Sequence, residues 1–232
     1  KINYSQRSLA SMAESSKLTI GYWPFQGAAH PARLLLAYHK VPFEDKSYTD
    51  RKDWFEGDKV NIKMDLPNLP YIKDGDFVLT ESSAILHYAA IKTGNKDLLG
   101  KTDVDAAKIT QLFGFAGDIQ TAIFGLIRDK EYEKNRDTYL AEKVGPLFDK
   151  LSKYLGEKEF PIGYLTWADF RVFFALDMVH RMNPEFLAKW SNLDKYHQRI
   201  NNDTVKAYRK SPGYPKLLAS PEYVTFTGEE KQ

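Results

Sequence analysis

Hydrophobic positions follow two different rhythms along the chain, and the change comes near residue 93. Before this point, short apolar segments predict strands, whereas helical spacing begins at residue 28 and again after residue 82. The predicted strands lie at residues 18–21, 41–48, 71–72 and 77–79. Pro31 falls in the first turn of the first helix, where proline is tolerated. The order is therefore strand, helix, strand, an irregular helical loop, and then two strands and a helix.

Beyond residue 93 the pattern is helical, with no convincing strand. Helices are predicted at residues 104–125, 133–155, 167–180 and 193–201. Thr166 and Asp169 have the spacing of a capping box, in which Thr166 caps the N–H three residues on and Asp169 reaches back. The sequence thus predicts an α/β plus all-α protein, with a thioredoxin-like domain at residues 17–97 and an all-helical domain at residues 98–232. Residues 1–16 carry serines and charges, and a disordered leader is expected there.

Three local signals meet in residues 65–85. The Leu69-Pro70 bond follows a turn-forming Pro67-Asn68 pair and precedes a predicted strand, so it is a candidate for the cis isomer. Asp74-Gly75 predicts a hairpin turn. Candidate caps for the next helix are Thr80, Ser82 and Ser83. Together the signals predict a turn, a hairpin and a helix N-terminus in succession.

This succession has a chemical use. The backbone N–H and C=O of Leu69 would be available to pair with an extended peptide as an added strand. The helix N-terminus, with the hydroxyl of Ser82, suits a carboxylate. A small anionic peptide would satisfy both, and the alternative interpretation is a structural turn and cap without a ligand.

The composition removes several classes of function. The chain has no cysteine, which excludes disulfides, thiolate zinc sites, thiol nucleophiles and thiol redox chemistry. Its five histidines lack metal-ligand spacing, so no metal site is expected, and they are interpreted as surface or satisfied core groups. The formal net charge is +2 without a basic run, and no nucleic-acid partner is expected. No apolar run matches a membrane span or a secretory signal, which predicts a cytoplasmic protein without a membrane partner.

Several segments, taken in order, resemble the cytosolic glutathione transferases, most closely the mu class. They are residues 21–23, 27–30 with 33–36, 65–71, and 81–82 followed by 84–86. The pair Thr166 and Asp169 resembles a box that this family keeps in its helical domain. The resemblance implies a homodimeric enzyme that conjugates glutathione, as a co-substrate and without a cofactor, to hydrophobic electrophiles.

The chemistry that this resemblance implies needs a thiolate. A cysteine-like thiol has a reference pKa of about 8.5, so little thiolate exists at neutral pH. A hydroxyl that donates to the sulfur stabilises the anion by about 1.5–3 kcal/mol, which lowers the thiol pKa by roughly one to two units. Tyr22, at the end of the first predicted strand, is the candidate donor. The alternative interpretation is an ordinary half-buried tyrosine.

The resemblance also implies the binding residues. The glutathione site would contain Tyr22, Trp23, Arg51, Trp54, Lys59, Asn68, Leu69, Pro70, Glu81, Ser82 and, acting across a dimer, Asp118. The electrophile pocket would contain Phe25, Ala28, Phe124 and Arg128. Within the first set, the backbone of Leu69 would pair with the cysteinyl unit and Ser82 would hold the γ-glutamyl carboxylate. Glu81, where the mu class usually has Gln, would accept from the ligand ammonium.

Some positions depart from the mu pattern. The loop before Arg51 is shorter, so the mu-type loop over the active site is expected to be missing, and Lys59 fits only with one inserted residue. Leu66 stands where the mu class has an aromatic key for the partner subunit, which predicts a weaker or altered dimer contact. Arg128 falls near a second active-site tyrosine, whose assistance is expected to be absent. Asp118 fits a solvated helix residue nearly as well as a ligand contact.

Two other functions remain open on the sequence alone. One is a non-catalytic protein that binds glutathione or apolar compounds, and the other is a glutathione-dependent isomerase of the prostaglandin synthase type. The sequence does not name the electrophile, and residues 211–232 carry no pattern that assigns them a place.

Overall fold

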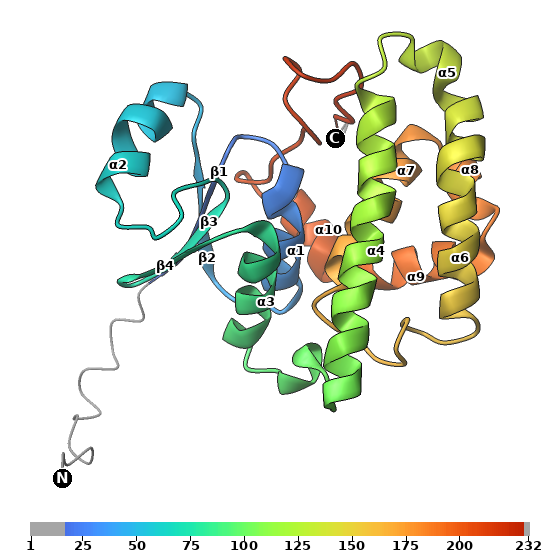
Figure 1. Ribbon diagram of the computed structural model, residues 1–232, viewed down its shortest axis with the longest axis horizontal. Coiled ribbons are helices and arrows are strands. Elements are labelled where there is room, and N and C mark those ends of the chain that lie inside the picture. The colour runs from blue at the N-terminus through green and yellow to red at the C-terminus, as the bar shows by residue number, and fades with distance from the viewer. Residues whose placement is uncertain (1–16, 230–232) are drawn as a thin grey trace.

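The computed structural model describes residues 17–229 and has a lobe built on a sheet beside a helical lobe (Figure 1). The strands are β1 (Leu18–Tyr22), β2 (Phe43–Ser47), β3 (Tyr71–Asp74) and β4 (Phe77–Thr80), in the sheet order β2-β1-β3-β4. β1 pairs in parallel with β2 and antiparallel with β3, and β3 and β4 form an antiparallel hairpin. The predicted thioredoxin-like order is confirmed, while the leader predicted at residues 1–16 lies outside the described residues.

Two helices of this lobe pack against each other beside the sheet. Both lie where the sequence pattern predicts a helix. The 3₁₀ turn Gly27–Ala29 leads into α1 (His30–Tyr38), and α1 contacts α3 (Ser82–Lys92). The irregular stretch between β2 and β3 contains a π-helical turn (Asp53–Asp58) and α2 (Lys59–Asn61). The Leu69-Pro70 peptide bond is cis, as predicted.

The second lobe contains only helices among its described residues. After the 3₁₀ turn Lys96–Leu99, they are α4 (Asp103–Ile127), α5 (Tyr132–Tyr139), a π-helical segment (Leu140–Val144), α6 (Gly145–Leu155), α7 (Asp169–Met182), α8 (Pro184–Ala188), α9 (Ser191–Ile200) and α10 (Asp203–Arg209). The predicted helices are present. α8 and α10 were not predicted, because five and seven residues are too few to show a helical period.

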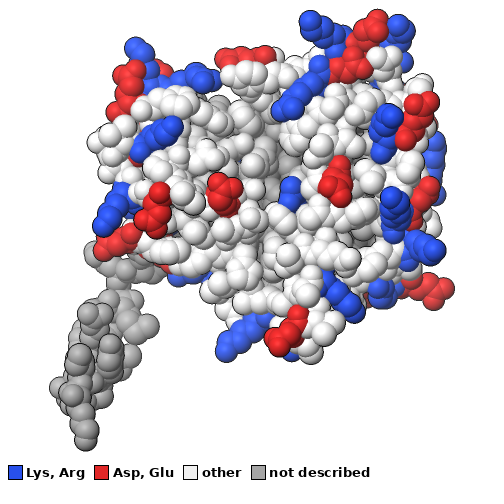
Figure 2. Space-filling model, in the orientation of Figure 1, with Lys and Arg blue, Asp and Glu red and all other residues white. Residues whose placement is uncertain are grey.

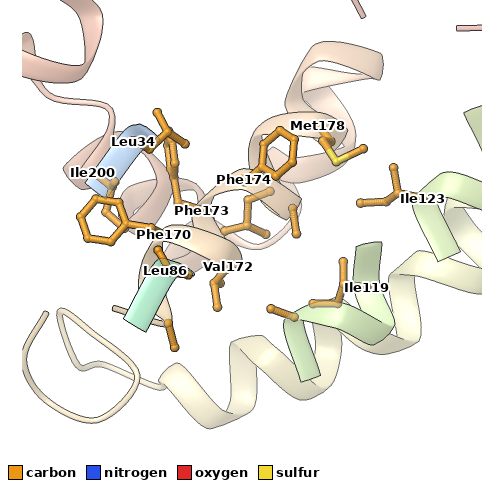
Figure 3. Close-up of a cluster of buried hydrophobic side chains, with 14 of the residues drawn as sticks. Leu34, Leu86, Ile119, Ile123, Phe170, Val172, Phe173, Phe174, Met178 and Ile200 are labelled. Atoms are coloured by element: carbon orange, nitrogen blue, oxygen red, sulfur yellow. The ribbon is translucent and has the colours of Figure 1, made fainter. Parts of the chain in front are cut away.

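One hydrophobic core joins the two lobes (Figure 3). Leu34 of α1 and Leu86 of α3 belong to the same buried cluster as Ile119 of α4 and Phe170 and Phe174 of α7. α7 is buried on nearly all sides, and its buried positions are mostly apolar, with Asp169 and Asp177 as charged exceptions. Because both lobes pack on α7, the shared core fixes their relative position and so defines the cleft between them.

Both capping predictions need correction. Asp169 does accept the backbone N–H of Thr166, at 2.6 Å, but the Thr166 hydroxyl donates to the same carboxylate at 2.7 Å and does not cap the helix. At α3 the cap position is Glu81, and no side chain caps this helix. The hydroxyl of Thr80 donates instead to the carbonyl of Leu66, at 2.8 Å. In both places a nearby acceptor competes for the hydroxyl, which a local pattern does not reveal.

Asp177 of α7 is the centre of a buried ionic cluster. Its carboxylate accepts from Arg181 at 2.6 Å, from Arg209 at 2.7 Å and from His197 at 3.0 Å. Burial by itself raises the pKa of Asp177, but the two arginines and His197 overcome this effect and hold it well below the usual value. The cluster therefore carries an ionised carboxylate in the core, where α7, α9 and α10 meet.

His30 contradicts the expectation of satisfied core histidines. Its side chain is fully buried between the rings of Phe174 and Tyr214, and neither ring nitrogen has a hydrogen-bond partner within residues 17–229. Burial lowers the pKa of His30 well below its usual value, so the ring is neutral.

The described chain offers neither a bilayer-spanning helix nor a metal cluster. No helix within residues 17–229 is long and apolar enough to cross a membrane, and no group of three or more His, Cys, Asp or Glu side chains there could hold a metal ion. On the face shown in Figure 2, acidic and basic side chains are interspersed.

Candidate active site

A cleft of about 350 Å³ is lined by residues from both lobes. The sheet lobe contributes Tyr22, Phe25, Gly27, Ala28, Pro31, Ser82 and Leu86. Opposite them, α4 contributes Phe113, Gly117, Gln120, Thr121, Phe124 and Arg128, whose spacing of three to four residues places them on one helix face. Arg171 and the C-terminal residues Ala219, Ser220, Tyr223 and Val224 complete the lining. The cleft is therefore an elongated space along α4.

Tyr22 ends β1 and lines this cleft. Its hydroxyl oxygen accepts the backbone N–H of Ala28 at 3.3 Å, and its ring packs edge-to-face on Phe25 with centroids 5.4 Å apart. Burial raises the pKa of Tyr22, and the Ala28 N–H and the charge of Arg33 offset this only in part. The phenol is therefore protonated at neutral pH, and its proton is available for donation to a ligand.

Arg33 fixes the turn that follows Tyr22. This fully buried side chain of α1 pairs with Asp45 of β2 at 2.8 Å and donates to the carbonyls of Phe25 at 2.9 Å and Gln26 at 3.3 Å. Its guanidinium lies 5.7 Å from the centre of the Tyr22 ring. One buried cation thus ties the turn, the strand β2 and the phenol together.

The C-terminal segment also holds this turn. The backbone N–H groups of Gln26 and Gly27 donate to the carbonyls of Leu217 at 2.8 Å and Leu218 at 3.0 Å. The Gln26 amide donates to the Tyr214 hydroxyl, at 2.9 Å. Residues 211–232 had no predicted place because these contacts use mostly the backbone, which leaves no side-chain pattern.

The four residues predicted for the electrophile pocket come together in the cleft. Phe25 and Ala28 lie beside Tyr22, and Phe124 and Arg128 face them from α4. The guanidinium of Arg128 lies 5.6 Å from the centre of the Phe124 ring. Residues about a hundred positions apart in the sequence thus line the same cleft as Tyr22, the candidate hydrogen-bond donor.

The resemblance places Trp23, Trp54 and Lys59 around the glycyl end of glutathione, with Arg51 as a weaker member, and in the structure these residues are more dispersed. Trp23 and Arg51 line a neighbouring groove of about 370 Å³, where Arg51 donates to the Tyr223 hydroxyl at 3.0 Å. Trp54 is only 3% exposed and stacks on Tyr71 inside an aromatic cluster. Lys59 is exposed, with Nζ 5.3 Å from the centre of the Phe55 ring.

The cysteinyl and γ-glutamyl ends of the predicted site lie around the cis bond and the start of α3. The side-chain oxygen of Asn68 accepts the N–H of Leu69 at 2.9 Å, so this N–H already has an acceptor. Pro70 is buried, and Glu81 has a φ of +70° at the cap position of α3. Of these residues, Ser82 lines the cleft.

Comparison with known proteins identifies the family. The model "Glutathione S-transferase, N-terminal domain" matches residues 18–90, and "Glutathione S-transferase, C-terminal domain" matches residues 117–212. The class-mu 26 kDa isozyme 51 of Fasciola hepatica is 34% identical over 213 residues, which are 90% of this chain and 95% of that protein. The chain belongs to the glutathione S-transferase family. Human glutathione S-transferase Mu 4 is 32% identical over 87% of this chain and 94% of that protein.

The fold agrees with a solved structure of the same family. Glutathione S-transferase Blo t 8 superposes with a TM-score of 0.75 at 25% identity, and the alignment covers 90% of this chain and 99% of that one. The predictions of a glutathione S-transferase, similar to the mu class and with a thioredoxin-like first domain, are therefore confirmed.

In this glutathione S-transferase, Asp118 is another predicted site residue that lies outside the cleft. It is exposed on α4 and does not line the cleft with Tyr22. Its charge acts on Arg171 of the same chain. A contact of Asp118 with glutathione in a partner subunit stays a prediction.

Several residues of the site were not predicted. Gly27 has a φ of +43° and leaves no room for a Cβ atom beside Tyr22, and Arg33 holds the turn. Gln120, Arg171 and Tyr223 line the cleft. Arg171 did give a signal, since it is a charge within a helix that is otherwise largely buried. The others have ordinary local patterns, and only the fold brings them to the site.

Proposed function

We propose that the protein conjugates glutathione to hydrophobic electrophiles and that the Tyr22 hydroxyl donates a hydrogen bond to the glutathione sulfur. The observation that carries this proposal is the position of Tyr22, a protonated and largely buried phenol at the cleft. The Ala28 N–H, which donates to the phenol oxygen, leaves the phenolic proton free to point at a ligand. The relatives that match most of the chain are named glutathione S-transferases.

The proposed tripeptide site runs along the sheet lobe, residues 17–97. Ser82 takes the γ-glutamyl carboxylate at the N-terminus of α3, where unpaired N–H groups favour an anion. Leu69 pairs with the cysteinyl backbone, and its N–H leaves Asn68 when the ligand binds. Trp23 and Arg51 contact the glycyl end, in the neighbouring groove that Tyr223 also lines.

The proposed electrophile site is completed by the helical lobe, of which the structure describes residues 98–229. Phe25 and Phe124 supply apolar surface beside Tyr22, and Arg128 makes one side polar. We also propose a homodimer, in which Asp118 reaches the glutathione of the other subunit. The exposed Leu66, 68% accessible in the single chain, would contribute to the contact between subunits.

The variant Tyr22→Phe tests the mechanism. Loss of a charge-assisted hydrogen bond of about 1.5–3 kcal/mol should raise the pKa of the bound thiol by roughly one to two units. The expected result is a kcat/KM for an aryl halide that falls about 10- to 100-fold at neutral pH and recovers as the pH rises. Ultraviolet difference spectra of bound glutathione measure the thiolate directly.

A matched control is Tyr154→Phe, which removes a hydroxyl from a residue of α6 outside the cleft. This variant should keep the wild-type pH profile. Undiminished conjugation in Tyr22→Phe would contradict the role of Tyr22. Retention of the wild type on immobilised glutathione without turnover of any aryl halide would favour a non-catalytic binding protein.

A further inference from the structure

Arg171 is the unusual residue in the wall of the cleft. It extends from α7, the most buried helix, and its side chain reaches the face of α4 that lines the cleft. Its Nε donates to Oε1 of Gln120 at 2.7 Å, and Nη1 donates to the carbonyl of Phe113 at 3.2 Å. The guanidinium lies 4.0 Å from the centre of the Phe113 ring. These contacts hold the group in one orientation.

Gly117 provides the space for this guanidinium. A Cβ atom at Gly117 would lie 2.9 Å from Nη2 and 3.2 Å from Cζ of Arg171, closer than ordinary contact. The guanidinium therefore lies directly against the backbone of α4, in a recess that a larger residue would fill. Phe113, Gly117 and Gln120 form this recess around the Arg171 guanidinium.

Two hydrogen-bond donors in this recess have no acceptor among the described residues. Nη2 of Arg171 has no acceptor within residues 17–229, and neither does Nε2 of Gln120. Burial lowers the pKa of Arg171, and the charge of Asp118 offsets this only in part. No carboxylate of the described chain lies within 4.0 Å of the guanidinium. An arginine remains charged in proteins, and a partly buried charge without a contacting counterion favours an anionic ligand.

Arg171 lies at a defined end of the cleft. From position 113 to position 128, α4 rises by about 22 Å. Trp167 packs on both His87 of α3 and Phe113, so α3 lies beside the Phe113 end. At the other end, the N–H groups of Thr225 and Phe226 in the C-terminal segment donate to the carbonyl of Ile127. Arg171 is therefore at the α3 end of the cleft, and Arg128 is at the opposite end.

We propose that Arg171, together with Gln120, is an anion contact that takes a ligand carboxylate at the α3 end of the cleft. This inference rests on the proposed function. The γ-glutamyl carboxylate of glutathione is the favoured source, because Ser82, its proposed anchor, begins α3 and lines the same cleft. A carboxylate on the electrophile is the other source of the same chemistry. In either case Arg171 selects for an anionic group and is not a catalytic residue.

A binding cycle tests the first source. Calorimetry would compare glutathione with an analogue that lacks the α-carboxylate of the γ-glutamyl residue, in the wild type and in Arg171→Gln. We expect the wild type to bind glutathione about 10- to 100-fold more tightly than the analogue. In Arg171→Gln this ratio of affinities should be about tenfold smaller. Arg136→Gln, a surface arginine with the same charge change, should keep the full preference.

A second arm tests the electrophile. The ratio of kcat/KM for a carboxylated aryl halide to that for its neutral counterpart would be measured in the same three proteins. A change in the first arm supports the proposal with glutathione as the source, and a change in this arm alone supports it with the electrophile as the source. No change in either arm, in an Arg171→Gln protein that melts like the wild type, overturns it. A wild type that fails to bind glutathione overturns the proposed function as well.

A structural measurement covers the case in which Arg171→Gln does not fold. A crystal structure of the wild type with an S-alkylated glutathione carrying a carboxylate on the alkyl group would show both possible anions. The γ-glutamyl carboxylate or the alkyl carboxylate within about 3.2 Å of Nη2 supports the proposal. If neither of these two carboxylates lies there, the proposal is overturned.

Discussion

The variant Gly27→Ala should displace the candidate catalytic phenol without altering it. Gly27 has a φ of +43°, a conformation that costs an L-residue about 1–2 kcal/mol. An added Cβ would lie 2.7 Å from Cε1 and 2.8 Å from the hydroxyl oxygen of Tyr22, and 2.9 Å from Cε2 of Phe25. Carbon atoms in good contact are separated by about 3.5 Å or more. Tyr22 would have to move by about 0.8 Å.

The expected size of the effect follows from these distances. Overpacking of this kind costs about 1–3 kcal/mol, so the variant should lose about 2–5 kcal/mol of unfolding free energy in total. A displacement near 1 Å in an active site can reduce the rate about 100-fold. The conjugation rate of Gly27→Ala should therefore fall about 10- to 100-fold, and the pKa of the bound glutathione thiol should rise toward that of Tyr22→Phe.

Urea unfolding would measure the stability, and the pH dependence of kcat/KM would measure the thiol pKa. Gly114→Ala is the matched control, because a Cβ at Gly114 meets no atom within 4 Å and its position is inside α4. That variant should gain about 1 kcal/mol of stability and keep its activity. A Gly27→Ala protein with wild-type stability and an unchanged thiol pKa would refute the argument that the turn has no room beside Tyr22.

Three further predictions concern stability and assembly. Asp177→Asn leaves the partly buried Arg181 and Arg209 without their carboxylate and should cost about 3–5 kcal/mol in urea unfolding, whereas the exposed Asp137→Asn should change little. Burial raises the pKa of Asp169 to about 6, so the stability that Asp169 contributes should be complete below pH 4 and should fall by about 2–3 kcal/mol as the pH rises to 7. An unfolding free-energy difference between wild type and Asp169→Asn that stays constant over this range would contradict the raised pKa. The chain should sediment at twice its 26.7 kDa mass, and Leu66→Asp should weaken this dimer more than a charge at the similarly exposed Val60.

The local elements of the fold could be predicted because each one depends on neighbouring residues. Pro70 after a turn pair, Asp74-Gly75 between two apolar segments, and the long apolar period of α7 each indicate their own backbone. The order of these elements was enough for the thioredoxin-like class. The short helices α8 and α10 were not predicted, because they are stabilised by tertiary contacts and have too few residues to show a helical period.

Side-chain hydrogen bonds were less predictable than the elements that carry them. The Thr166 hydroxyl bonds to a carboxylate and Thr80 bonds to a carbonyl 14 residues away, although both were expected at helix caps. His30 is buried without a partner among the described residues, against the expectation for a core histidine. Each outcome depends on which acceptor the fold brings within about 3 Å, and that distance is not a property of the local sequence.

The sequence by itself determined the class of fold, the family resemblance and a phenol at the end of the first strand, because these follow from residue types and short spacings. Only the tertiary structure decided that Gln120, Arg171 and Tyr223 share a cleft with Tyr22, and that residues 217–218 hold the turn beside it. These contacts join segments up to about 200 positions apart. They arise because both lobes bury their apolar faces on α7, and that shared burial places the cleft.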